Sequence, residues 1–121
     1  MTERGFRALV AQALQELPEA FLPGLDQVDV VVEEAPSPEL LADLGIPQDE
    51  GLYGLYEGPS LLERSPDLPE LPSRIILYRL PLCEDFTDPV ELRGEVIRTL
   101  LHELAHHLGI EDDRLDELGW D

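Results

Sequence analysis

The segment DPVELRGEVIRTLLHELAHHLG, residues 88–109, carries the signals of one long α-helix. Asp88 is a favourable N-cap residue, and Pro89 suits the first helical position. Gly109 permits the left-handed turn with which many helices end. The sequence therefore predicts a helix over residues 89–108, about 30 Å long at 1.5 Å per residue.

All three histidines of the chain lie near the end of this predicted helix. His102 and His106 are four residues apart, so their side chains lie one turn apart and about 40° apart around the helix axis. Two imidazoles at that spacing can bind one metal ion, and His-Glu-x-x-His is a known zinc-binding spacing. The competing interpretation is a pair of solvated histidines on an acidic helix. A metal site is favoured because the pair lies on a well-capped helix with an apolar face.

The apolar residues of this segment gather on the side of the helix opposite the two histidines. They are Ile97, Leu100, Leu104 and Leu108. A helix patterned in this way buries its apolar side. The histidine side, together with Glu95 and Arg98, is then expected to form the floor of a cleft.

Glu103 follows the first histidine and is turned about 100° from it around the helix. Its carboxylate can approach a metal-bound water without occupying a ligand position. A zinc ion with three protein ligands lowers the pKa of its bound water to about 7, and a neighbouring carboxylate then accepts the proton. The sequence therefore predicts Glu103 as the catalytic base and one Zn²⁺ per chain as the cofactor.

A catalytic zinc site needs a third protein ligand besides the two histidines. The turn at Gly109 brings Asp112 within reach of the metal. Asp112 is also well placed to cap a short final helix, and Asp113 is the alternative ligand; the ligand role of Asp112 is favoured. His107 points about 140° away from His102, so it is expected to be structural or to orient a ligand.

The rest of the chain predicts one α+β domain, residues 1–121, with a small sheet. Helical periodicity and capping residues predict two further helices before the long one. Runs rich in β-branched and aromatic residues predict three strands. The predicted helices span residues 3–17 and 37–45, with another short one within 112–120, and the predicted strands span 28–34, 52–58 and 74–80.

The composition limits the classes of partner that the protein can bind and indicates its cellular compartment. The net charge of -19 argues against nucleic acid, whose phosphates would be repelled. No apolar run approaches the roughly 18–20 residues that span a bilayer, and the N-terminus has no signal-peptide pattern. The single cysteine, Cys83, cannot form an internal disulfide, which suggests a reducing compartment. We expect a cytoplasmic protein that binds neither nucleic acid nor membrane.

Three segments, GLYEG, LPSRIILYRLPL and HELAHHLGIEDDRLDELGW, occur in this order along the chain. Together they resemble the minimal zincin-like metallopeptidases, a family of small bacterial proteins. The resemblance implies a zincin-like fold, in which a small mixed sheet packs against a long active-site helix. It also implies His102 and His106 as zinc ligands and Glu103 as the base. Asp112 matches the position at which the related metzincins have a third histidine.

Proteins of this kind often bind an extended peptide along an exposed sheet edge. Residues 52–58 are the candidate edge, because their glycines and the Pro-rich segment that follows would spoil a central strand. Gly54 there indicates a bulge or the close approach of another backbone. Tyr53 or Tyr56 could donate a hydrogen bond to an oxyanion, although a packing role for both rings is favoured.

The favoured function is therefore a zinc-dependent metallopeptidase that hydrolyses short or extended peptides or unstructured protein segments. The alternative is a non-catalytic, metal-stabilised module that binds a peptide in the same groove. Glu103 favours the enzyme, because a purely structural zinc site would be closed by a fourth protein ligand. The small size favours the binding module, because the chain has no room for the second subdomain that usually walls a protease cleft.

Overall fold

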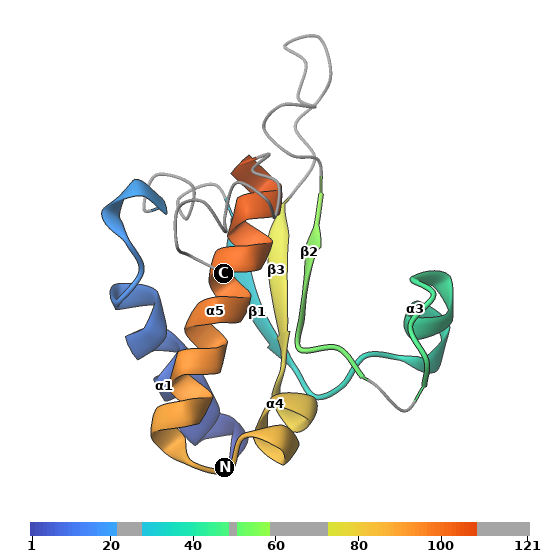
Figure 1. Cartoon of the computed structure of the whole chain (residues 1–121), viewed down its shortest axis with the longest axis horizontal. Helices are drawn as coiled ribbons and strands as arrows, with labels where there is room; N and C mark the ends of the chain where they lie inside the picture. The colour runs from blue at the N-terminus through green and yellow to red at the C-terminus, as the bar shows by residue number, and fades with distance from the viewer. Residues whose placement is uncertain (22–27, 49–50, 59–72, 109–121) are drawn as a thin grey trace, which may run out of the picture.

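The computed structural model describes residues 1–21, 28–48, 51–58 and 73–108. Its centre is a three-stranded sheet in the order β1–β3–β2 (Figure 1). The strands are β1 (Asp29–Glu33), β2 (Gly54–Glu57) and β3 (Arg74–Tyr78). β1 runs parallel to β3, whereas β2 runs antiparallel to it. The sheet is therefore mixed, and β2 lies on an edge, as the sequence predicted.

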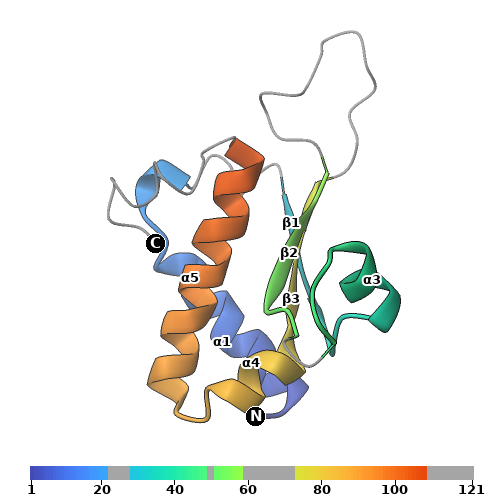
Figure 2. The same ribbon diagram turned by 45° about the vertical axis from the view of Figure 1, so that its right-hand side comes forward.

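Helices lie on both sides of this sheet (Figure 2). On one side α5 contacts β2, β3 and α1, and on the other side lies α3. α4 connects β3 to α5, and a short 3-10 turn, η1, follows α1. The bounds are Glu3–Gln15 for α1, Glu19–Phe21 for η1, Pro38–Asp43 for α3, Arg79–Asp85 for α4 and Pro89–Leu108 for α5. The predicted α+β class is confirmed.

The core lies between the sheet and the helices α1 and α5. Side chains alternate between the two faces of a strand, so Ile75 and Leu77 of β3 face the helices, and both are completely buried. The α1 and α5 side chains packed there are Phe6, Leu9, Val10, Ala13, Leu92, Val96, Leu100, Leu101, Leu104 and Ala105. Burial of each large apolar side chain contributes about 1.5–3 kcal/mol. This core fixes α5 against the sheet.

The long helix begins at Pro89, as its capping residues predicted, and continues to Leu108, the last residue that the structure describes. The Asp88 side chain accepts a hydrogen bond of 3.3 Å from the N–H of Glu91, the expected N-cap contact. Leu100 and Leu104 are fully buried, but Ile97 is only partly buried. The core face is therefore rotated slightly from the predicted one.

The third predicted strand is shorter than expected. β3 ends at Tyr78, and residues 79–85 form α4, a helix that the sequence did not predict. Pro81 lies in the first turn of α4, where its missing N–H breaks no helical hydrogen bond. The chain turns there because Leu80 donates a backbone hydrogen bond of 2.9 Å to Glu34 and Leu82 enters the core.

The two other described helices are close to their predictions. α1 ends at Gln15, two residues before the predicted end. In α3 the Ser37 side chain accepts a hydrogen bond of 3.1 Å from the N–H of Leu40, as expected of an N-cap. Gly45, just past that helix, has a φ of 73°, the left-handed conformation that glycine commonly adopts after the end of a helix.

Gly54 is the point at which β2 comes closest to α5. A Cβ atom added at Gly54 would lie 2.6 Å from Cγ2 of Thr99 on α5 and 3.1 Å from the carbonyl oxygen of Ile76 on β3. No side chain fits there without movement. The sequence predicted a bulge or the close approach of another backbone here, whereas the nearest group in the structure is the Thr99 side chain of α5.

We expect Gly54→Ala to lower the free energy of unfolding by about 1–3 kcal/mol, the usual cost of overpacking. Urea denaturation of the metal-free protein measures this change. Gly94→Ala is the matched control, because a Cβ at Gly94 on α5 meets nothing within 4 Å. Alanine is the better helix former by about 0.5–1 kcal/mol, so the control should stabilise. An unchanged stability in the Gly54 variant would contradict the tight contact.

Candidate metal and catalytic site

A pocket lies between α5 and the segment that leads into β2. Its volume is about 340 Å³, which is at the small end of the range for ligand sites, roughly 300–1,000 Å³. Six of its lining residues come from α5 and three from the strand segment. They are Glu95, Arg98, Thr99, His102, Glu103 and His106, with Leu52, Tyr53 and Gly54. The helix face that the sequence assigned to a cleft therefore lines one.

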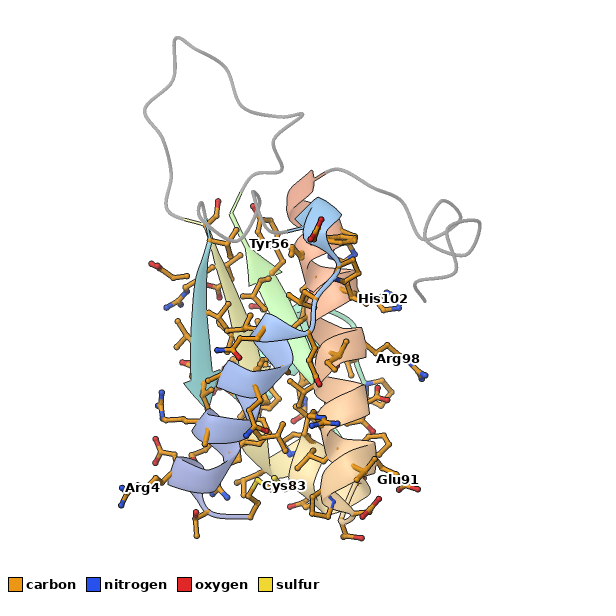
Figure 3. The ribbon with its side chains drawn as sticks, turned by 90° about the vertical axis from the view of Figure 1, so that its left-hand side faces the viewer. Arg4, Tyr56, Cys83, Glu91, Arg98 and His102 are labelled. Carbon is orange, nitrogen blue, oxygen red and sulfur yellow. The ribbon has the colours of Figure 1, made fainter. Side chains whose placement is uncertain are left out.

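His102 and His106 lie on successive turns of α5 and line this pocket. His102 is half-buried, whereas the His106 side chain is 51% exposed. Figure 3 shows His102 and Arg98 projecting from the same side of the helix. The four-residue spacing thus places both imidazoles beside one cavity.

Glu103 is largely enclosed in the pocket, with a side chain only 14% exposed. Its Oε2 accepts a hydrogen bond of 2.8 Å from the backbone N–H of Tyr56 on β2 and lies 3.3 Å from Nδ1 of His106. Burial raises the pKa of the Glu103 carboxyl, and the two histidines and the Tyr56 N–H oppose that rise. Hydrogen bonds to a charged group contribute about 1.5–3 kcal/mol, which offsets part of the burial cost.

The donor atoms that border the pocket suit zinc. Imidazole nitrogen is a common zinc ligand, and a catalytic site adds a third protein ligand and keeps one position open. His106 meets Glu103 through Nδ1, so its other ring nitrogen, Nε2, lies on a different side of the ring. The two histidines therefore fit two of the three ligand positions that such a site requires.

The third ligand position falls on a part of the chain that the structure does not describe. Asp112 and its alternative Asp113 lie outside the described residues, and so does the predicted short helix after Gly109. The His107 side chain is likewise outside them. Within the described residues, no three or more His, Cys, Asp or Glu side chains form a group that could hold a metal ion.

The two tyrosine hydroxyls have partners in the structure. The Tyr53 hydroxyl donates to Asp85 at the end of α4, and its ring meets Phe86 edge to face, with ring centroids 5.7 Å apart. The bond to Asp85 raises the pKa of Tyr53 to about 12. The Tyr56 hydroxyl bonds to Ser73 at 3.2 Å. Both rings also pack against the core, as the sequence favoured, but their hydroxyls, which were expected to be in water, bond to protein groups.

Two contacts of the site were not predicted from the sequence. One is the Tyr56 N–H on Glu103, which joins residues 47 positions apart. The other is the bond between Tyr53 and Asp85, which are 32 positions apart. A backbone N–H carries no side-chain signal. Asp85 lies in α4, a helix that the sequence did not predict. Its position beside Tyr53 could therefore not be predicted either.

The chain is similar to known proteins along most of its length. The model of the zincin-like metallopeptidase family matches residues 25–120. A solved structure of a conserved hypothetical protein from Thermus thermophilus is similar, with 30% sequence identity and a TM-score of 0.61. The match covers 99% of this chain and 100% of that one. A search of the curated proteins found no match. No helix within the described residues is long and apolar enough to cross a membrane. The chain belongs to the zincin-like metallopeptidase family.

Proposed function

We propose that the protein is a zinc-dependent peptidase that hydrolyses short peptides or extended, unstructured protein segments. One observation carries the proposal. His102, Glu103 and His106 line one small pocket beside an edge strand of the sheet. Metal ligands, a base and a surface for an extended backbone would thus meet in one place. Family membership supports the same reaction class.

In this proposal His102 and His106 hold the zinc ion together with Asp112. When bound, the ion would lower the pKa of a water molecule at the site to about 7, so that this water could lose a proton at neutral pH. The acidic character of the chain, with a net charge of -19, favours cations in general. The protein's own groups would accept the proton and bind the peptide.

Glu103 serves as the general base. A base is most effective when its pKa is close to the working pH, and burial raises the pKa of Glu103 in that direction. Its carboxylate accepts a proton from the water whose oxygen bonds to the peptide carbonyl carbon, and it returns that proton to the amine that leaves as the C–N bond breaks. Its low exposure, 14%, limits competition from bulk water.

The edge of β2 supplies the surface for an extended peptide. Tyr78 donates a hydrogen bond of 2.9 Å to the Tyr53 carbonyl, and antiparallel strands alternate bonded and non-bonded pairs. Leu55 and Glu57 therefore face β3 through their backbone groups, whereas Gly54 directs its N–H and C=O outward. Gly54 also lines the pocket, so an incoming peptide can add there as a further strand.

The pocket size supports a short or extended substrate. About 340 Å³ accommodates a few residues of one chain but not a folded surface. The described face of α5 beside His102 also carries Glu95 and Arg98, which border the same cavity. Nη1 of Arg98 lies 3.6 Å from Oε2 of Glu95. Charges of both signs thus surround the place where substrate side chains would lie.

The experiment that tests the function combines metal analysis with a peptide-library cleavage assay. Protein purified without chelator or affinity tag should contain about one zinc per chain, and its cleavage of peptides should stop when a chelator removes the metal. Zinc-loaded protein that cleaves nothing in a broad library would eliminate the peptidase proposal. A peptide captured intact from that library would identify the binding module instead.

A separate variant tests Asp112. Asp112→Ser removes the carboxylate but keeps the capping ability of the position, since serine is a good N-cap residue. If Asp112 is a ligand, zinc affinity measured by calorimetry should fall at least ~10-fold, as it does even for outer-shell partners of metal sites. If Asp112 is only a cap, zinc affinity should not change. The second result would move the assignment to Asp113 or to a more distant residue.

A further inference from the structure

The contact between Tyr56 and Glu103 joins the sheet edge to the helix. The backbone N–H of Tyr56 donates a hydrogen bond of 2.8 Å to Oε2 of Glu103. We propose that this N–H positions the Glu103 carboxylate for proton transfer, so that β2 and the base on α5 work as one unit. The inference rests on the proposed function and adds Tyr56 as a positioning residue.

The direction of the Tyr56 N–H follows from the strand register. Tyr56 pairs with Ile75 and Gly54 pairs with Leu77, and both are non-bonded pairs because Tyr78 bonds to Tyr53. The N–H of Tyr56 therefore points out of the sheet. On an open edge such a group would meet water or another strand. Here the Glu103 carboxylate occupies that position.

Two contacts in register hold strand and helix together. Gly54 packs against Thr99, and Tyr56 bonds to Glu103. Two residues along a strand cover about 6.6 Å, and four residues along a helix cover about 6 Å. The two spacings nearly match, so a strand lying along α5 brings both pairs together. Packing at Gly54 therefore sets the distance at which Tyr56 meets the carboxylate.

One oxygen of the Glu103 carboxylate is held from two sides. Oε2 receives the Tyr56 N–H and lies 3.3 Å from Nδ1 of His106. Because both contacts go to the same oxygen, they fix the orientation of the carboxylate and leave Oε1 as the atom to receive the proton. A fixed carboxylate of this kind needs little rearrangement before it acts, which is how positioning lowers a barrier.

This arrangement also limits how a peptide can pair with β2. The Tyr56 N–H is already used, so an incoming backbone does not receive a hydrogen bond from it. Gly54 offers both of its outward backbone groups beside the pocket. The peptide residue opposite Gly54 is then the one that makes two backbone bonds, at a fixed distance from Glu103. Substrate register and base position are set by the same strand.

Amide hydrogen exchange, followed by NMR, tests the contact without substrate. We expect the Tyr56 amide to exchange at least ~10-fold faster in Glu103→Ala than in the wild type. The amides of Leu55 and Glu57, which face β3, should change less than ~3-fold and serve as internal controls. Protection of Tyr56 should persist when one equivalent of zinc is added. Equal Tyr56 exchange in wild type and variant, or loss of protection with zinc, would overturn the proposal.

A pair of variants at one position tests the role in catalysis. Tyr56→Pro and Tyr56→Ala both remove the side chain, but only proline removes the N–H. Proline is tolerated on an edge strand where the N–H points away from the ladder. At equal zinc occupancy, kcat should be at least ~10-fold lower for the proline variant than for the alanine variant, with KM within ~3-fold.

The kinetic result separates positioning from substrate binding. A higher KM with equal kcat in the proline variant would show that the N–H binds substrate, and the proposal would be wrong. If the wild type cleaves no peptide, the proposed function fails, but hydrogen exchange still decides whether Tyr56 holds Glu103 in the zinc-loaded protein. If the proline variant does not fold, Tyr56 exchange in the wild type and in Glu103→Ala, with and without zinc, still decides whether the N–H holds the carboxylate, and its absence overturns the proposal.

Discussion

Glu103→Gln should reduce peptide hydrolysis at least ~100-fold, because a general base typically contributes 10²–10⁴ to the rate. Glutamine keeps the shape of the side chain and an oxygen that can accept the Tyr56 N–H, but it cannot take up the proton. Zinc content should stay at one per chain, because Glu103 is not expected to be a ligand. Steady-state kinetics on a cleaved library peptide, with zinc measured on the same sample, checks both expectations.

Glu95→Gln is the matched control for this variant. Glu95 borders the same pocket on the same helix and lies eight residues earlier, about 12 Å along the axis. Its loss of charge should leave kcat within ~3-fold of the wild type, since it cannot reach the reacting atoms, and any effect should be on KM, because Glu95 borders the space for substrate side chains. A Glu103 variant with full zinc and wild-type activity would show that another group is the base.

The sequence predicted those parts of the fold that depend on local signals. The start of α5 was correct because Asp88 and Pro89 are strong start signals and the apolar period is long. The edge position of β2 was correct because Gly54 is unfavourable in a central strand. Both predictions use the intrinsic conformational preferences of single residues.

The unpredicted helix α4 shows the limit of such signals. RIILYRL is apolar and β-branched at its start, so periodicity extended the strand through Leu80. In the structure, the backbone bond from Leu80 to Glu34 and burial of Leu82 end the strand at Tyr78. These contacts join segments distant in sequence, and tertiary contacts of that kind override local preference.

The candidate site also has features that local sequence signals predicted and features that depend on tertiary contacts. The spacing of His102 and His106 placed both imidazoles beside the pocket, since helix geometry fixes the angle between them. The partner of Glu103 could not be found, because it is a backbone N–H on β2. The direction of that N–H depends on the pairing of β2 with β3, which no single segment encodes. The role of Asp112 stays a prediction from spacing.

His102→Ala and His106→Ala should each lower zinc affinity at least ~100-fold, more than the loss typical of an outer-shell partner. Each variant removes one of the imidazoles that α5 presents to the pocket, and the remaining ligands cannot complete the site. Binding by the wild type should also weaken in acid, because protons compete with zinc for the imidazole nitrogens. Calorimetry at several pH values measures both effects.

The third histidine, His107, provides the control, because it has the same chemistry and helical spacing predicts that it points about 140° away from His102. His107→Ala should therefore keep about one zinc per chain. If His107 orients a ligand, zinc affinity should fall by ~10–100-fold, the loss typical of an outer-shell partner. Circular dichroism of the three metal-free variants separates loss of a ligand from loss of the helix. Zinc lost from the His107 variant but retained by the His106 variant would place the metal on another face of α5. Binding that is equal in all three variants would exclude the histidines as ligands and leave the acidic side chains as the source of the metal affinity.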